Sequence, residues 1–266
     1  MSTLKKILGL VCVLIPATQV ALADSGFSVG AEYSEGDYGT GETSRSWYIP
    51  LGWRYRGGDF STSITVPYLI VEGSSLVTAG GTPLSPSGMG GGGGGAGGGG
   101  GGTTNTTRYD SGLGDVVVSA SYQLLSESSH ALWLGTTAKV KFGTADESKA
   151  LGTGENDYTL QLEAARGALY GYAGYRVIGD TASVDYNDVA FAGVSLNMPL
   201  GKMSEWSVGY YAEEASVTGM DDVQEATLSV GGEFSKGLDY SLYYIAGLSD
   251  GSADSTIGVN FSSRLK

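Results

Sequence analysis

Hydrophobic and polar residues alternate with a period of two along most of the chain. In residues 27–34 (FSVGAEYS), the odd-numbered residues are apolar or aromatic and the even-numbered residues are polar or small. Residues 45–56 and 156–165 show the same alternation. Because successive side chains of a β-strand point to opposite faces, strict alternation over eight or more residues predicts strands with one apolar and one polar face.

Twelve such segments follow one another and predict an all-β chain. They lie at residues 27–34, 45–56, 60–71, 112–124, 131–142, 156–165, 169–178, 187–198, 206–214, 224–234, 240–248 and 255–263. Many run for about ten residues, the length that a tilted strand needs to cross a bilayer, whereas strands of soluble proteins average about 5–6 residues. We therefore predict a closed antiparallel transmembrane β-barrel of about 12 strands, with a soluble exported β-sandwich as an alternative.

The connections between the predicted strands alternate in length. The short ones lie near residues 57–59, 126–130, 166–168, 199–204 and 235–239, and the longer ones at 35–44, 72–111, 143–155, 179–186, 215–223 and 249–254. Outer-membrane barrels have short periplasmic turns and longer extracellular loops. Aromatic residues also gather at segment ends, as they do at membrane interfaces. The pattern therefore predicts which end of the barrel faces the periplasm.

The first 23 residues have the three parts of a secretory signal peptide. Lys5 and Lys6 form a basic start, residues 7–16 are apolar, and an A-x-A cleavage site ends at Ala23. We expect residues 1–23 to be removed and residues 24–266 to form the barrel in the outer membrane. The expected partners are outer-membrane lipid, lipopolysaccharide, the barrel-assembly machinery and a small-molecule solute that the sequence does not name.

Composition excludes several other kinds of site. The single cysteine, Cys12, lies in the predicted signal peptide, and the exported chain would carry 13 basic and 28 acidic residues, a net charge of −15. Such an acidic chain is poorly suited to nucleic acid, which requires clustered Lys and Arg. The one histidine, His130, lies beside a predicted short turn, and no Cys/His cluster suggests zinc. We therefore predict neither an enzyme nor a metal or cofactor site.

Residues 89–102, MGGGGGGAGGGGGG, contain twelve glycines and offer almost no side chain to pack. Glycine loses more backbone freedom on ordering than any other residue. The tract falls within the connection at 72–111, so we expect that connection to be a long extracellular loop, where water satisfies the backbone. Adhesion to a partner, or folding into the pore as a plug, are the alternatives for this tract.

Several short motifs follow one another in a fixed order. They are Pro50 and Pro67 within their strands, GLGD at 112–115, K-x-G-T-A-D at 141–146 and LGTGENDY at 151–158. In this order they resemble the outer-membrane channel family named for the MetA pathway of phenol degradation. The resemblance covers residues 44–178 well and the later hairpins only by pattern. It implies an outer-membrane β-barrel and the transport of small organic molecules. The chain departs from common barrels at its end, where Phe261 is followed by SSRLK.

Two of these motifs predict details of local structure. A turn near residues 57–59 that pairs residue 50 with 65 and 67 with 48 would turn both prolines toward the lumen, where a bulge or water could satisfy the freed carbonyls. Gly112 and Gly114 permit tight curvature where a strand leaves the long loop. Asp115 would then point inward, either to hydrogen-bond a loop to the strand or to contribute to selectivity.

The polar faces carry a small set of charges that are the candidates for lining a lumen. They are Glu32, Arg54, Asp115, Lys139, Lys141, Glu163, Glu213 and Glu233. We predict a passive channel with a narrow bore, whose selectivity depends on its diameter and on a ring of these charges. The alternative is a structural or surface-interaction barrel with a plugged interior.

Overall fold

The computed structural model describes residues 24–38, 41, 43–73, 108–126, 130–182 and 184–265. The predicted signal peptide, the glycine tract and most of the 72–111 connection lie outside these residues, so those predictions remain predictions.

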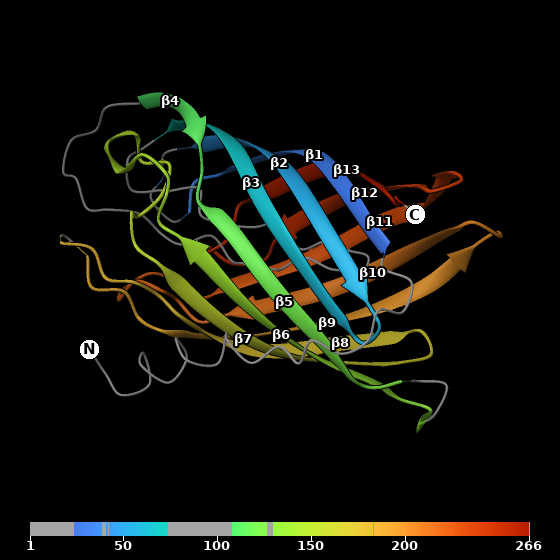
Figure 1. Cartoon of the computed structure of the whole chain (residues 1–266). Coiled ribbons are helices and arrows are strands. Elements are labelled where there is room, and N and C mark those ends of the chain that lie inside the picture. Colours follow the sequence, from blue (N-terminus) through green and yellow to red (C-terminus); the bar gives the residue numbers. More distant parts are fainter. Residues whose placement is uncertain are drawn as a thin grey trace.

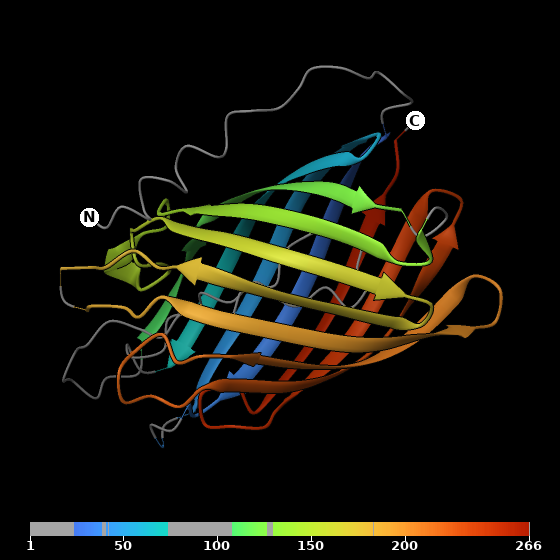
Figure 2. The ribbon, with the colours of Figure 1, turned by 90° about the horizontal axis from the view of Figure 1, so that it is seen from below.

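Thirteen strands in the described part of the chain form one antiparallel sheet that closes on itself (Figures 1 and 2). They are β1 (Asp24–Gly36), β2 (Ser44–Gly57), β3 (Phe60–Gly73), β4 (Arg108–Leu113), β5 (Val116–Leu125), β6 (Trp133–Phe142), β7 (Asp157–Arg166), β8 (Leu169–Val177), β9 (Val189–Leu200), β10 (Ser204–Glu213), β11 (Val223–Ser235), β12 (Leu238–Gly247) and β13 (Ser255–Ser263). The last strand, β13, pairs with β1 and closes the barrel. A short 3-10 helix, η1 (Glu147–Lys149), lies between β6 and β7. No helix in the described ranges has the length and apolar character to cross a membrane.

Two strands share one position in the barrel wall. β4 pairs with residues 68–73 of β3, and β5 pairs with residues 60–65 of the same strand. The wall therefore has twelve positions, as predicted, but the single strand predicted at 112–124 is divided at Gly114 and Asp115. The register explains the division: Leu113 lies opposite Tyr68 but Val117 lies opposite Thr65, so the pairing with β3 shifts by one residue between β4 and β5.

The two faces of the wall have opposite polarity. Large hydrophobic side chains point outward and are exposed, as for Leu162 (61% exposed) and Leu228 (55%). The positions between them are buried and polar. This set includes Ser119, Thr137, Thr159, Gln161, Ser207, Thr227, Ser229, Ser241 and Thr256. Because a soluble protein buries its apolar side chains instead, this inverted arrangement is that of a barrel whose outer surface meets lipid.

The faces of β8 follow the same rule. The sequence leaves open whether Tyr170 and Tyr172 or Leu169 and Ala173 point outward. In the structure Leu169 and Ala173 are exposed, whereas the two tyrosines are partly buried and point inward. Tyr172 contacts buried residues of neighbouring strands, so packing inside the barrel decides the orientation.

Most connections at the two ends differ in length as predicted. At one end, residues 58–59, 167–168, 201–203 and 236–237 form tight turns, whereas the other end carries the connections at 37–43, 143–156, 178–188, 214–222 and 248–254. The connection predicted as short at 126–130 extends over 126–132, so it is as long as those at 37–43 and 248–254. Ser25 and Leu265 pair at the short-turn end. The residues that follow Phe261 therefore continue beside β1 beyond the end of β13. Many other barrels end in an aromatic residue at this place.

The two strand prolines lie opposite one another. The β2–β3 register pairs Pro50 directly with Pro67, so the predicted pairing of 50 with 65 and 67 with 48 is wrong by two residues. Gly57 pairs with Phe60 across a two-residue turn, which is tighter than the predicted one. Both prolines still share the inward face, because their positions alternate with the exposed Leu51 and Tyr68.

Candidate channel interior

The wall formed by β6, β7 and β8 is joined by hydrogen bonds around one carboxylate. Glu163 accepts the Thr137 hydroxyl at 2.6 Å, the Gln161 amide at 3.1 Å and the Tyr170 hydroxyl at 3.1 Å. Lys139 lies on the same wall, two residues from Thr137, and is buried. Three donors from the wall itself satisfy Glu163, so this predicted lumen residue has a structural role in fixing adjacent strands.

A second group joins β8 to β10 across β9. The guanidinium of Arg176 forms an ion pair with Glu213, and the Tyr211 hydroxyl donates to the same carboxylate at 2.5 Å. Arg176 and Glu213 are 6% and 3% exposed. Sequence reasoning selected Glu213 but missed Arg176. The residue lies in the segment whose faces the alternating tyrosines left ambiguous, which explains the omission.

Aromatic rings fill the interior beside this ion pair. The ring centroids of Tyr172, Phe191 and Tyr211 lie 6.3 Å from one another, and the Arg176 guanidinium lies 6.0 Å from the Phe191 centroid. Gly193 leaves room for this cluster, since a Cβ there would lie 2.5 Å from Cζ of Tyr172. The period-two pattern does not reveal an aromatic cluster on the inward face, because aromatic residues occur on both faces.

The opposite wall contains a simpler pair. The Tyr243 hydroxyl on β12 donates to Glu32 on β1 at 2.7 Å, across β13, and both side chains are buried. Tyr38, in the loop after β1, is half-buried. Burial raises the pKa of Tyr38 to about 12, and the Glu225 carboxylate contributes to this shift.

A cavity of about 610 Å³ occupies the short-turn end of the barrel. Residues of β1–β3 and β9–β13 line it, including Arg54 and Glu233. Arg264 forms ion pairs there with Asp239 at 2.9 Å and with Glu233 at 3.6 Å. The cavity is therefore a vestibule of mixed polar and apolar lining, in which positive and negative charges lie close together.

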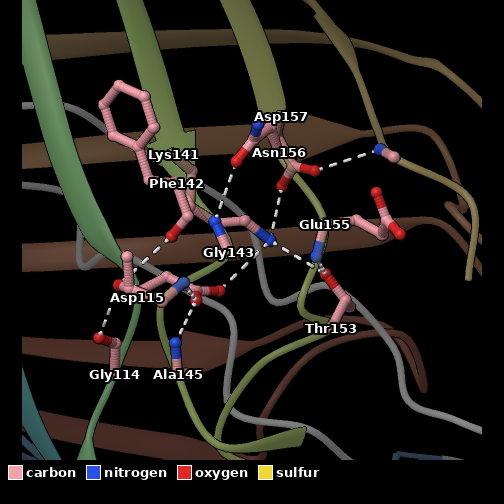
Figure 3. A network of polar contacts seen from close by, with 12 residues as sticks. Gly114, Asp115, Lys141, Phe142, Gly143, Ala145, Thr153, Glu155, Asn156 and Asp157 are labelled. Atoms are coloured by element: carbon pink, nitrogen blue, oxygen red, sulfur yellow. Dashed lines mark hydrogen bonds and ion pairs between the residues drawn. The ribbon is translucent and has the colours of Figure 1, made fainter.

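The long-loop end contains a further group of charges (Figure 3). Lys141 Nζ lies 2.8 Å from Asp157 and 3.4 Å from Asp115, and it also contacts the Thr153 hydroxyl at 3.4 Å. The Asp115 carboxylate accepts the backbone amide of Ala145 at 2.9 Å, among other contacts. Of the two interpretations of Asp115, the loop–strand hydrogen bond is therefore present. Motifs that are separate in sequence, at 112–115, 141–146 and 151–158, meet in this network.

The eight predicted residues thus fall into separate groups. Asp115 and Lys141 meet at the long-loop end, where Glu213 is the last residue of β10. Arg54 and Glu233 line the vestibule, and Glu32, Lys139 and Glu163 occupy different parts of the wall between the two ends. The predicted single ring of charges is wrong, because the inward positions that carry charge lie at different heights on their strands. No group of three or more His, Cys, Asp or Glu side chains suited to a metal ion occurs in the part of the chain that the structure describes.

Comparisons with known proteins extend this description. No protein-family model and no curated protein matches the sequence. Among solved structures, an outer-membrane channel from Pseudomonas putida F1 is similar with a TM-score of 0.63 and 13% identity, covering 95% of this chain and 100% of that one. The translocator domain of the autotransporter NalP from Neisseria meningitidis is similar with a TM-score of 0.50 and 13% identity, covering 98% and 95%.

The fold of the Pseudomonas putida channel agrees with the fold that the family resemblance at residues 44–178 implies. Both neighbours agree with the predicted location in the outer membrane. At this level of identity the similarity concerns the fold. The chain is a closed, antiparallel, twelve-position β-barrel of the outer-membrane type.

Proposed function

We propose that this barrel is a passive channel for small organic solutes. The observation that carries the proposal is a polar inner wall that leads, at the short-turn end, into a vestibule of about 610 Å³ whose lining includes charges of both signs. The similarity in fold to an outer-membrane channel supports it. Solutes would diffuse down their gradient, and the width of the interior would limit their size.

The inner wall suits solutes without a large net charge. Hydroxyl pairs join neighbouring strands, as at Ser63–Ser119 (2.7 Å) and Ser207–Ser229 (2.6 Å). Such hydroxyls can exchange hydrogen bonds with a passing solute or with water. Several inward charges have protein partners of opposite sign, which reduces the net field that an ion would meet. Neutral polar and weakly apolar molecules are therefore the proposed class.

One observation favours the alternative of a structural barrel with a plugged interior. Side chains between the two ends are deeply buried, as for Lys139 (7% exposed) and Tyr211 (2%). An open bore of the porin type would leave inward side chains in contact with water. The proposed channel must therefore be narrow, and a filled interior would conduct nothing.

Single-channel recording separates the two functions. We expect the purified, folded protein in a planar bilayer to give openings of uniform, small conductance at each insertion, because a narrow polar interior admits few ions at a time. The control is the same preparation after heat denaturation, which should give no openings. Insertions that are shown by antibody or fluorescence but remain silent would overturn the channel proposal in favour of the structural barrel.

The vestibule gives a test of ion preference. We expect Arg54→Glu to shift the reversal potential in a salt gradient toward cation preference, because it reverses a charge in the vestibule wall. Arg166→Glu is the matched control: this residue lies at the same end of the barrel and is exposed, but it does not line the cavity. Equal shifts for both variants would show that Arg54 has no special position in the conduction path.

A further inference from the structure

The loop between β6 and β7 is held to the barrel wall by Asp115. The carboxylate Oδ1 of Asp115 accepts the backbone amides of Thr144 and Ala145, each at 2.9 Å. Further along the same loop, Leu151 is 1% exposed and packs with Tyr48 and Leu69 on the inward face of β2 and β3. The loop therefore folds inward over the long-loop end of the barrel.

A second loop, between β8 and β9, is held by Asp157 in a similar way. The carboxylate Oδ1 of Asp157 accepts the backbone amide of Gly179 at 3.1 Å. Ile178, Tyr186 and Val189 pack together behind this contact and are buried. Burial raises the pKa of Tyr186, and the Asp157 carboxylate adds to the shift. This loop too is folded against the rim.

Lys141 lies between the two carboxylates and forms ion pairs with both (Figure 3). Its side chain is 17% exposed, so water screens these pairs only partly. The two aspartates use their remaining oxygens for the loop amides. We propose that Lys141 is a positioning residue that locks the β6–β7 and β8–β9 loops together at the mouth of the barrel.

The physical basis is the position of one cation between two acceptors. Without Lys141, Asp115 and Asp157 would be two like charges in a poorly hydrated site, and each would gain by moving toward water. Each carboxylate would draw its loop with it, so both loops would open more often. For a channel, opening of this lock would widen the mouth. That consequence rests on the proposed function, whereas the lock itself does not.

Thiol labelling measures the opening of each loop separately. Residues 24–266 contain no cysteine, so Ala145→Cys and Ile178→Cys each introduce a single buried reporter, one per loop. We expect Lys141→Gln to raise the labelling rate at both reporters by about tenfold. Loss of a hydrogen bond to a charged group should make local opening of each loop more frequent by about this factor, and a buried thiol reacts only when its loop opens. Lys141→Arg should restore slow labelling at both, because it keeps the charge.

Single carboxylate variants test whether each loop is held by its own carboxylate while Lys141 is common to both. Asp115→Ala should accelerate labelling at position 145 and leave position 178 slow, and Asp157→Ala should do the reverse. Lys149→Gln is the matched control, a lysine of the same loop whose ammonium donates to the Ser111 carbonyl at 3.5 Å, and it should change neither rate. Heat-dependent gel migration verifies that each variant is a folded barrel.

The proposal is overturned if folded Lys141→Gln protein labels at the unsubstituted rate at either position. The labelling experiment does not depend on conductance. A barrel that shows this labelling pattern but conducts nothing would support the proposed role of Lys141 and contradict the channel. A barrel that conducts but lacks the pattern would support the channel and contradict the role of Lys141.

Discussion

Replacement of Arg176 by glutamine is expected to lower the free energy of unfolding by about 3–5 kcal/mol, the usual cost of breaking a buried ion pair from one side. The substitution leaves the Glu213 carboxylate buried, with the Tyr211 hydroxyl as its one remaining partner in the group described above. It also removes the cation beside the Phe191 ring. Urea unfolding of the barrel in lipid vesicles, followed by tryptophan fluorescence, measures the loss.

Two further variants identify the cause. Addition of Glu213→Gln to Arg176→Gln should recover most of the lost stability, because the double variant buries no unpaired charge. Arg45→Gln removes an exposed arginine that pairs with Glu35 at 3.5 Å, and such a pair contributes only about 0–1 kcal/mol. If the double variant were as unstable as Arg176→Gln, loss of the arginine's packing would be the cause.

An arginine in place of Leu162 should destabilise the barrel by about 2–4 kcal/mol, as measured for basic residues near the bilayer midplane. Leu162 lies in the central part of β7 and points outward, with 61% of its surface exposed. In a soluble protein the same exposure would make the substitution nearly neutral. The same urea experiment in vesicles therefore tests whether lipid covers this face.

The control for this variant is the same substitution at a different depth in the bilayer. Leu200 also points outward but is the last residue of β9, beside a short turn. Leu200→Arg should cost only about 0–1 kcal/mol, because a side chain at the interface reaches water. Equal costs at the two positions, or none at either, would contradict a membrane-spanning barrel with this orientation.

The interior combines two features that are commonly found apart. Its inward residues are polar, as in a channel, but several of the charges are used to join strands and to hold loops. Glu163 links three neighbouring strands, Glu213 is paired with Arg176, and Asp115 binds a loop. If the barrel is the proposed channel, these paired groups leave hydroxyls as the main surface for a solute.

The sequence by itself determined the fold of this protein. Its period of two assigns each side chain to one of two faces, and no other regular structure has that period. Because the apolar face is continuous over about ten residues in many segments, the barrel, its twelve wall positions and its two unlike ends follow from local pattern alone. The predicted lumen residues were selected by the same rule, which explains why Glu32, Lys139 and Glu213 are all buried inside.

Only the tertiary structure decided which of those residues meet. The register sets the height of each residue in the wall, and a shift of two residues keeps the face while changing every neighbour, as Pro50 and Pro67 show. Arg176 and its aromatic neighbours were hidden because tyrosine suits either face. The Asp115–Lys141–Asp157 network joins two loops across several strands, and no periodic pattern specifies contacts between loops. Local alternation therefore determined which face of the barrel wall each side chain occupies, and long-range packing determined which side chains contact one another.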